Sequence, residues 1–227
     1  KGSFLRKLLR ACCQNNSEFL SHWKKYKVDH YLEFPLEWGL GSSSTLIFNM
    51  ARWADVNPYH LYFDVASGSG YDIACAGADG PLIYSLGEDS ASIEEIDFKP
   101  PFTDQLYFLP LNHKTDSQHA VEQVRTKKPA SAIIEQANAL TEKLVEIRKL
   151  EGFEQWVRDH EQLVSRYIGQ ERAKNRLFSD FWGEVKSLGA WGGDLLLVSS
   201  SKNRQETELY FKGKGYPQLI GYEELIL

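Results

Sequence analysis

A glycine- and hydroxyl-rich stretch in the first quarter of the chain has the composition of an anion-binding loop. Gly39 and Gly41 are followed directly by a run of hydroxyl residues, Ser42 to Thr45, and then by an apolar helical pattern that starts at Leu46. A glycine turn that opens into a helix presents unpaired backbone N–H groups and the positive end of the helix dipole. We therefore expect this stretch to bind phosphate, with the hydroxyls available to a phosphate oxygen or a metal ion.

Two more glycine clusters follow, one before an acidic residue and one ending in an acidic residue. Ser67-Gly-Ser-Gly70 precedes Asp72, and the last cluster runs from Gly189 to Asp194. Asp72 comes just before apolar residues at an expected helix start, where the helix dipole would keep it ionised as a general base. Two plainer interpretations stay open, namely serines that only cap a helix and an aspartate that only caps one.

The loops need elements to position them, and the hydrophobic periodicity predicts a mixed α+β chain. Helices are expected over 4–12, 45–54, 58–65, 71–78, 117–125, 133–147 and 153–168. Strands are expected over 27–34, 81–86, 92–98, 106–111, 195–199 and 208–211. The Pro-Pro pair in Lys99–Phe102 interrupts both kinds of element, so we expect a domain over 1–101 and a second over 102–227.

Composition narrows the class of protein. The formal net charge of −5 argues against a general nucleic-acid binder but allows a local pocket for an anionic metabolite. The three cysteines form no Cys-x-x-Cys pair, which argues against structural zinc and suits a reducing, cytoplasmic setting. No apolar run approaches the roughly 20 residues that span a bilayer. A homodimer stays open.

The order and content of the three clusters resemble one family, the GHMP kinases. Pro35 to Ser44 is similar to that family's phosphate-binding second motif, and Ser67 to Asp72 is similar to its Ser-Gly-x-x-Asp segment. Ser187 to Asp194 resembles the third motif, and its Gly-Gly-Asp ending is similar to the phosphomevalonate kinase branch. The string Gly70-Tyr-Asp-Ile-Ala74 resembles a bacterial subgroup called GYDIA.

The resemblance implies a fold and a set of site residues. The expected fold is a domain like domain 2 of ribosomal protein S5 followed by a ferredoxin-like α/β sandwich, with the active site in the cleft between them. Asp72 would be catalytic, and Ser43 or Ser44 would be a Mg²⁺ ligand. The ATP phosphates would contact Gly39, Leu40, Gly41, Ser42, Ser43, Ser44, Gly189, Gly192 and Gly193, and the substrate would contact Gly70, Tyr71, Lys114, Ser117 and Trp191.

Two departures from the family pattern bear on activity. The family's first motif is absent, so we expect the natural protein to carry a further N-terminal segment. Trp38 and Trp191 stand where the family usually has small residues, and Trp191 would crowd the third glycine turn.

The function expected from this resemblance is phosphotransfer from ATP to a hydroxyl or phosphate of an anionic metabolite, similar to mevalonate or phosphomevalonate. Two alternatives stay open. One is an ATP-dependent decarboxylase like those acting on diphosphomevalonate. The other is a non-catalytic relative that binds a nucleotide or metabolite, which the two tryptophans and the absent motif favour.

Overall fold

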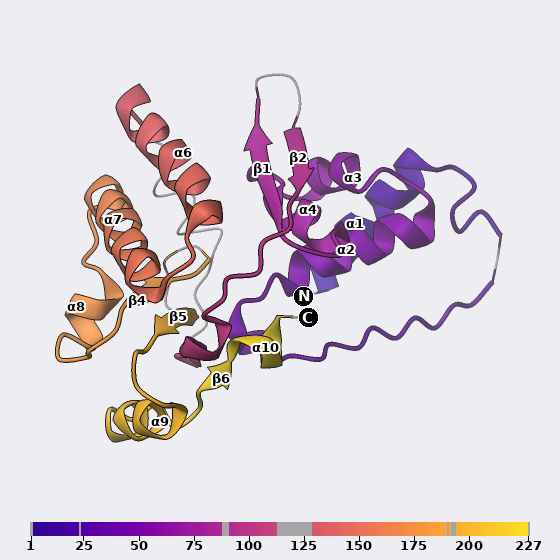
Figure 1. Cartoon of the computed structure of the whole chain (residues 1–227). Helices are drawn as coiled ribbons and strands as arrows, with labels where there is room; N and C mark the ends of the chain where they lie inside the picture. Colours follow the sequence, from indigo (N-terminus) through magenta and orange to yellow (C-terminus); the bar gives the residue numbers. More distant parts are fainter. Residues whose placement is uncertain are drawn as a thin grey trace. The chain divides into compact units, whose positions relative to one another are not determined.

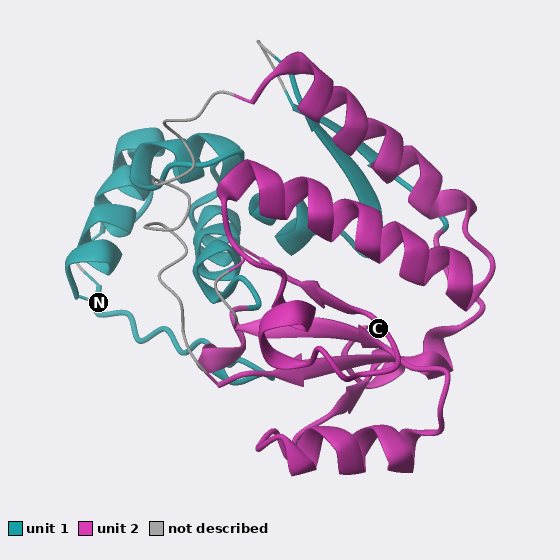
Figure 2. Cartoon of the chain, turned by 90° about the vertical axis from the view of Figure 1, so that its left-hand side faces the viewer, with its two compact units in different colours: residues 1–35, 40–97 teal, residues 36–39, 98–227 magenta. Residues whose placement is uncertain are grey.

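The computed structural model describes residues 2–22, 24–87, 91–112, 129–189, 191 and 194–226. These form two compact units (Figure 2). Unit 1 comprises Lys1–Pro35 and Leu40–Asp97, and unit 2 comprises Leu36–Gly39 and Phe98–Leu227. Helices and strands occur in both units, so the expected α+β class is confirmed. The chain passes between the units after Pro35, after Gly39 and after Asp97, so Leu36–Gly39 of the expected domain 1–101 belongs to unit 2.

In its described residues, unit 1 contains helices α1 to α4 and an antiparallel pair of strands (Figure 1). Its core lies between the first three helices, where Leu8, Ile47 and Leu61 are almost fully buried. Burial of such a side chain stabilises the fold by roughly 1.5–3 kcal/mol. The elements are α1 (Gly2–Asn15), α2 (Ser42–Ala54), α3 (Pro58–Val65), α4 (Tyr71–Gly77) and the antiparallel pair β1 (Leu82–Leu86) and β2 (Ala91–Glu95).

Unit 2 is built on a four-stranded antiparallel sheet of order β4-β5-β3-β6. Its strands are β3 (Leu106–Pro110), β4 (Val185–Ser187), β5 (Leu195–Ser199) and β6 (Ile220–Gly221). Its helices are α6 (Ser131–Glu146), α7 (Leu150–Ile168), α8 (Ala173–Leu177), α9 (Arg204–Gly213) and α10 (Tyr222–Leu225), with single 3₁₀ turns η1 (Leu36–Trp38) and η2 (Thr103–Gln105).

Alternate residues of β3 face two separate cores, because successive side chains of a strand point to opposite faces of a sheet. Tyr107 and Leu109 pack in a cluster that includes Phe211 of α9. Leu106 packs in the other cluster, with Trp156 of α7. Helices therefore cover both faces of the sheet. Helices α6 and α7 lie on one face and α9 lies on the other (Figures 1 and 2).

Two strands expected from the sequence do not form. Segment 27–34 alternates apolar and polar residues, but it pairs with none of the described strands, and Tyr31 is 88% exposed. Alternation alone does not make a strand, because a strand needs a hydrogen-bonded neighbour. Residues 208–211 lie inside α9, which begins at an Asn203 cap whose side chain accepts from Glu206 N–H at 2.9 Å. The expected helix 117–125 lies outside the described residues.

Within the described ranges, no helix has both the length and the apolar character needed to cross a membrane.

Candidate functional site

The start of α2 is an open helix terminus. Gly41 occupies the cap position in the left-handed conformation, with φ 72°, and no side chain caps the helix. The first backbone bond within the helix runs from Thr45 N–H to the Gly41 carbonyl at 3.0 Å. The N–H groups of Ser42, Ser43 and Ser44 precede that bond, so they are the donors that a helix start leaves for a ligand.

The serine hydroxyls of this turn differ in accessibility. Ser43 is exposed, Ser42 is half-buried, and Ser44 is only 6% exposed. The structure does not support the interpretation that these serines merely cap α2, because the cap residue is Gly41. Of the two expected Mg²⁺ ligands, Ser43 is the one whose side chain is open to a ligand.

The first and third glycine clusters meet within unit 2. Gly39 has φ 67°, and a Cβ atom added there would lie 2.6 Å from Asp194 Oδ2 and 2.8 Å from Asp194 Cβ. Asp194 is held by its backbone, since its carbonyl accepts from Leu111 N–H at 3.1 Å. Glycine at position 39 is thus required both by its backbone conformation and by the approach of Asp194.

The rest of the third cluster is described only in part. Gly189 has φ 60°, and Trp191 has φ 59°, which is unusual for a bulky residue. Trp191 therefore stands in a backbone conformation that a glycine adopts more easily. Gly192 and Gly193, together with the expected substrate residues Lys114 and Ser117, lie outside the described residues.

Asp72 lies in the first turn of α4, after Gly70, which caps the helix with φ 84°. Burial raises the pKa of its carboxyl above the ordinary value, while a hydrogen bond with the Tyr71 side chain opposes the rise. This differs from the expectation that the helix dipole would dominate, because desolvation penalises the charged form more strongly than a short helix stabilises it. A raised pKa suits a carboxylate that must accept a proton.

Two tyrosines that the sequence analysis did not select hold the loop before Asp72. Tyr62 donates a hydrogen bond to the Ser67 carbonyl at 3.1 Å, and Tyr84 donates to the Ser69 carbonyl at 2.5 Å. Tyr62 also fills the space next to Gly68, where an added Cβ would lie 2.5 Å from the hydroxyl. Nothing in the sequence distinguishes Tyr62 and Tyr84 from the other tyrosines of unit 1.

A buried ion pair at the strand leading into the third cluster was also not expected. Lys186 of β4 places its Nζ 3.9 Å from Oε1 of Glu161 on α7, and the Glu161 side chain is fully buried. Burial raises the pKa of Glu161 to about 7, against the opposing effect of Lys186. Burial also lowers the pKa of the neighbouring His160 to about 4.

The residues fit a phosphate better than a complete magnesium site. The described part of the chain contains no group of three His, Cys, Asp or Glu side chains arranged around a metal position. Asp55 follows the last residue of α2, so it lies about 20 Å from the start of that 13-residue helix. Asp64 accepts a hydrogen bond from Asn15 at 2.7 Å. A hydroxyl of Ser43 could still contribute one ligand to an ion held mainly by phosphates and water.

Comparison with known proteins supports the fold alone. No protein-family model and no curated protein matches the sequence. Among solved structures, the chain is similar to the Lin0012 protein from Listeria innocua, with a TM-score of 0.55 and 14% sequence identity. The match covers 74% of this chain and 56% of that one, so the chain corresponds to little more than half of its structural neighbour.

Proposed function

We propose that this protein is an ATP-dependent small-molecule kinase of the GHMP type. The observation that carries the proposal is the open start of α2, where left-handed Gly41 leaves the N–H groups of Ser42 to Ser44 without a side-chain cap. This is the arrangement that a phosphate chain needs. The strand order of unit 2 is also that of a β-α-β-β-α-β sheet, although its helices cover both faces.

In this proposal the chain's own residues bind and orient. The α2 turn holds the β- and γ-phosphates, and Ser43 offers its hydroxyl at their edge. Asp72, with its pKa raised by burial, accepts the proton of the acceptor hydroxyl as the new oxygen–phosphorus bond forms and the bond to ADP breaks. ATP with Mg²⁺ would supply the phosphoryl group and neutralise its charge. The acceptor is an anionic metabolite similar to mevalonate or phosphomevalonate.

A second candidate is a non-catalytic relative that binds nucleotide. Trp191 favours it, because a bulky residue with φ 59° occupies a turn that the proposed kinase would use near the transferred phosphate.

The deciding experiment is a panel of acceptors with ATP and Mg²⁺, comprising mevalonate, phosphomevalonate, homoserine and sugars. ADP release and ATP affinity should be measured separately for each acceptor. We expect Asp72→Asn to lower turnover by about 10²–10⁴-fold with ATP affinity retained. ATP binding without turnover on any acceptor would favour the non-catalytic relative, and absence of ATP binding would remove both candidates.

A further inference from the structure

The segment Ser67–Gly70, which joins α3 to α4 just before Asp72, is not fixed by its own backbone. Among the described residues, its first three members take part in no backbone–backbone hydrogen bond. Its two glycines have φ 148° and φ 84°, so the chain has more conformational freedom here than other residue types allow. The segment therefore depends on neighbouring side chains to keep one conformation.

Two tyrosine hydroxyls supply those contacts from two different elements. Tyr84 of β1 donates a hydrogen bond to the Ser69 carbonyl at 2.5 Å. Tyr62 of α3 donates to the Ser67 carbonyl at 3.1 Å. The bond of Tyr84 is the shorter of the two and is made by the residue that lies nearer to Asp72 in the chain. Tyr84 therefore joins β1 to the end of the segment that leads into α4.

The start of α4 has little to hold it apart from this segment. The helix is seven residues long, its cap residue is Gly70, and no side chain caps it. So short a helix has little stability of its own, and its position follows from what packs against it. A Cβ added at Gly70 would lie 3.4 Å from both Phe63 Cζ and the Tyr84 hydroxyl, so these side chains lie close against the cap. The position of Asp72 in the first turn thus depends on them.

The pKa of Asp72 gives a measure of how closely this region is packed. Burial raises that pKa, and a hydrogen bond with the Tyr71 side chain opposes the rise. The negative charge of Asp72 acts in turn on Tyr62, Tyr71 and Cys75, and both burial and this charge raise the pKa of each of them. These three groups are therefore uncharged near neutral pH. A looser segment would admit water to Asp72 and lower its pKa.

We propose that Tyr84 is a positioning residue for Asp72, whose hydroxyl holds the preceding segment against the start of α4. The inference rests on the proposed phosphotransfer for the role of Asp72 as proton acceptor, whereas the hydrogen bond itself can be tested without it. Without the Tyr84 hydroxyl, the bond of Tyr62 at the other end of the segment remains. We therefore expect local loosening around Asp72 rather than unfolding of unit 1.

The test compares the wild-type chain with Tyr84→Phe, which keeps the ring and removes the hydroxyl. NMR follows the pKa of the Asp72 carboxyl through the ¹³C shift of its side chain. We expect this pKa to fall toward the ordinary value in the variant, because water reaches the carboxylate. Exchange of the Ile73 and Ala74 amide protons, which bond to the Gly70 carbonyl at 3.0 and 3.3 Å, should become about fivefold faster. Amides of α2 should exchange as in the wild type.

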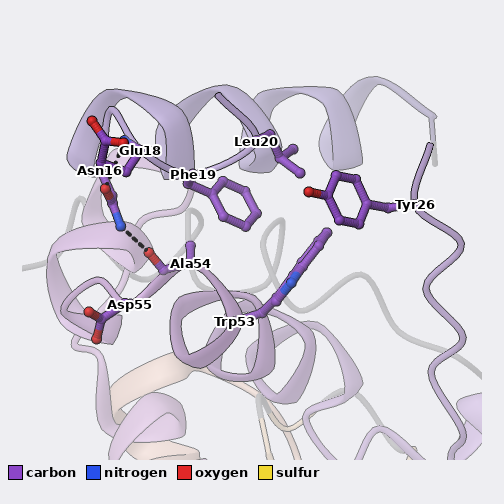
Figure 3. Close-up of a pocket in the computed structure, with 8 residues that line it drawn as sticks. All are labelled: Asn16, Glu18, Phe19, Leu20, Tyr26, Trp53, Ala54 and Asp55. Atoms are coloured by element: carbon purple, nitrogen blue, oxygen red, sulfur yellow. Dashed lines mark hydrogen bonds between the residues drawn. The ribbon is translucent and has the colours of Figure 1, made fainter. Parts of the chain in front are cut away.

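Tyr26→Phe is the matched control, because it removes a tyrosine hydroxyl from another part of unit 1. Tyr26 meets Trp53 at 6.0 Å in a surface pocket whose lining residues lie between positions 16 and 55 of the chain (Figure 3). The control should leave the pKa of Asp72 and the amide exchange of α4 unchanged. The proposal is wrong if Tyr84→Phe changes neither readout, or if the control changes them as much. Faster exchange throughout unit 1 would also overturn it, since the hydroxyl would then stabilise the whole unit.

Turnover gives a second readout that depends on the proposed function. Because Tyr84 has no hydrogen bond to the start of α2, Tyr84→Phe should lower kcat about tenfold and leave the KM for ATP unchanged. A rise in that KM with kcat retained would contradict a role in positioning Asp72. If the wild-type chain turns over no acceptor, the proposed function fails, whereas the NMR comparison still decides whether Tyr84 positions Asp72.

Discussion

The two compact units differ in whether their polar groups are exposed to solvent or buried and paired. Unit 1 leaves the donors at the start of α2 uncapped and Ser43 exposed. Unit 2 encloses charge: Glu184 is 5% exposed and contacts Arg158, Arg172 and Lys174 at 2.8–3.0 Å. Open polar groups contribute little to stability and remain available to ligands, whereas enclosed ones must be paired to avoid a large desolvation cost.

The same contrast appears between two helix starts within unit 1. The α3 helix begins with Asn57, whose side chain accepts from the N–H groups of Tyr59 and His60 at 2.9 and 3.1 Å. The α2 helix begins with Gly41 and has no such cap. The Asn57 side chain satisfies the first N–H groups of α3, whereas no side chain caps the N–H groups at the start of α2. Of these two helix starts, α2 is therefore the candidate ligand site.

The largest expected effect comes from the enclosed charge of unit 2. Glu184→Gln leaves Arg158, Arg172 and Lys174 beside a neutral group, so we expect the free energy of unfolding to fall by about 3 kcal/mol. Glu208→Gln is the control, because its ion pair with Arg204 is exposed, and it should cost about 0.5 kcal/mol. Urea titration measures both changes. If both variants lost a similar free energy of unfolding, burial of Glu184 would not make its ion pairs more important than the exposed pair of Glu208.

The next effect is the pH dependence of unit 2. The pKa of Glu161 is raised to about 7, so its contribution to stability is full below its ordinary pKa of 4.5 and is lost as pH rises through about 7. The pKa of His160 is lowered to about 4, so its contribution is present above 6.5 and is lost as pH falls toward 4. Between pH 4.5 and 6.5 the contribution of Glu161 falls while that of His160 rises. The free energy of unfolding should therefore change little with pH in this range because of these two groups.

Single variants separate these two contributions. Glu161→Gln removes the loss at higher pH, so the stability attributable to His160 should rise as pH increases from 4 to 6.5. His160→Gln should leave the opposite slope, a loss as pH increases from 4.5 to 7. Urea titrations at a series of pH values measure both slopes. If stability changed with pH in the same way in both variants, the opposite roles given to Glu161 and His160 would be wrong. The cations that act on Glu161 are Lys186 and Arg172.

A smaller effect compares Gly39 and Gly41, two glycines of the proposed phosphate-binding loop. Gly39→Ala places a Cβ against Asp194 and also imposes φ 67° on an alanine, so we expect a loss of roughly 2 kcal/mol in the free energy of unfolding. Gly41→Ala imposes φ 72° with nothing within 4 Å of the new Cβ, so only the backbone cost of about 1 kcal/mol remains. Equal losses would show that the approach of Asp194 does not constrain the loop.

The cap of α3 gives an effect of about 1 kcal/mol. Asn57→Ala removes the acceptor for Tyr59 and His60 N–H, which should lower the free energy of unfolding by about that amount and leave phosphate affinity unchanged. Asn57→Asp keeps the acceptor and is the control. A change in phosphate affinity on Asn57→Ala would contradict the separation between the capped and the open helix start.

The smallest effect on stability belongs to the open start of α2. Ser43→Ala removes an exposed hydroxyl that does not cap the helix, so the free energy of unfolding should change by less than about 0.5 kcal/mol. Affinity for ATP or inorganic pyrophosphate should nevertheless fall, which calorimetric titration measures. Ser201→Ala, at an exposed position outside the candidate site, is the control for nonspecific loss of affinity. A destabilisation of about 1 kcal/mol, as for a cap, would remove the contrast with α3.

Local sequence patterns were sufficient to predict the helices that follow the first two glycine clusters. The helical spacing after Thr45 and the glycines before it predicted a helix start with N–H groups available to an anion, and the apolar periodicity predicted the helix over 58–65. Both features depend on residues adjacent in the chain, so neighbours in space could not change them. The alternating segment 27–34 failed as a strand for the converse reason, since pairing depends on a distant segment.

The sequence by itself predicted the glycine turns, the helices that follow the first two of them and the residues that could bind an anion. Only the tertiary structure decided that Asp194 lies against Gly39, that Tyr62 and Tyr84 hold the loop before Asp72, and that burial raises the pKa of Asp72. It also assembled the pocket of Phe19, Tyr26 and Trp53. Desolvation and contact depend on residues far apart in sequence, so they arise only when the chain has packed.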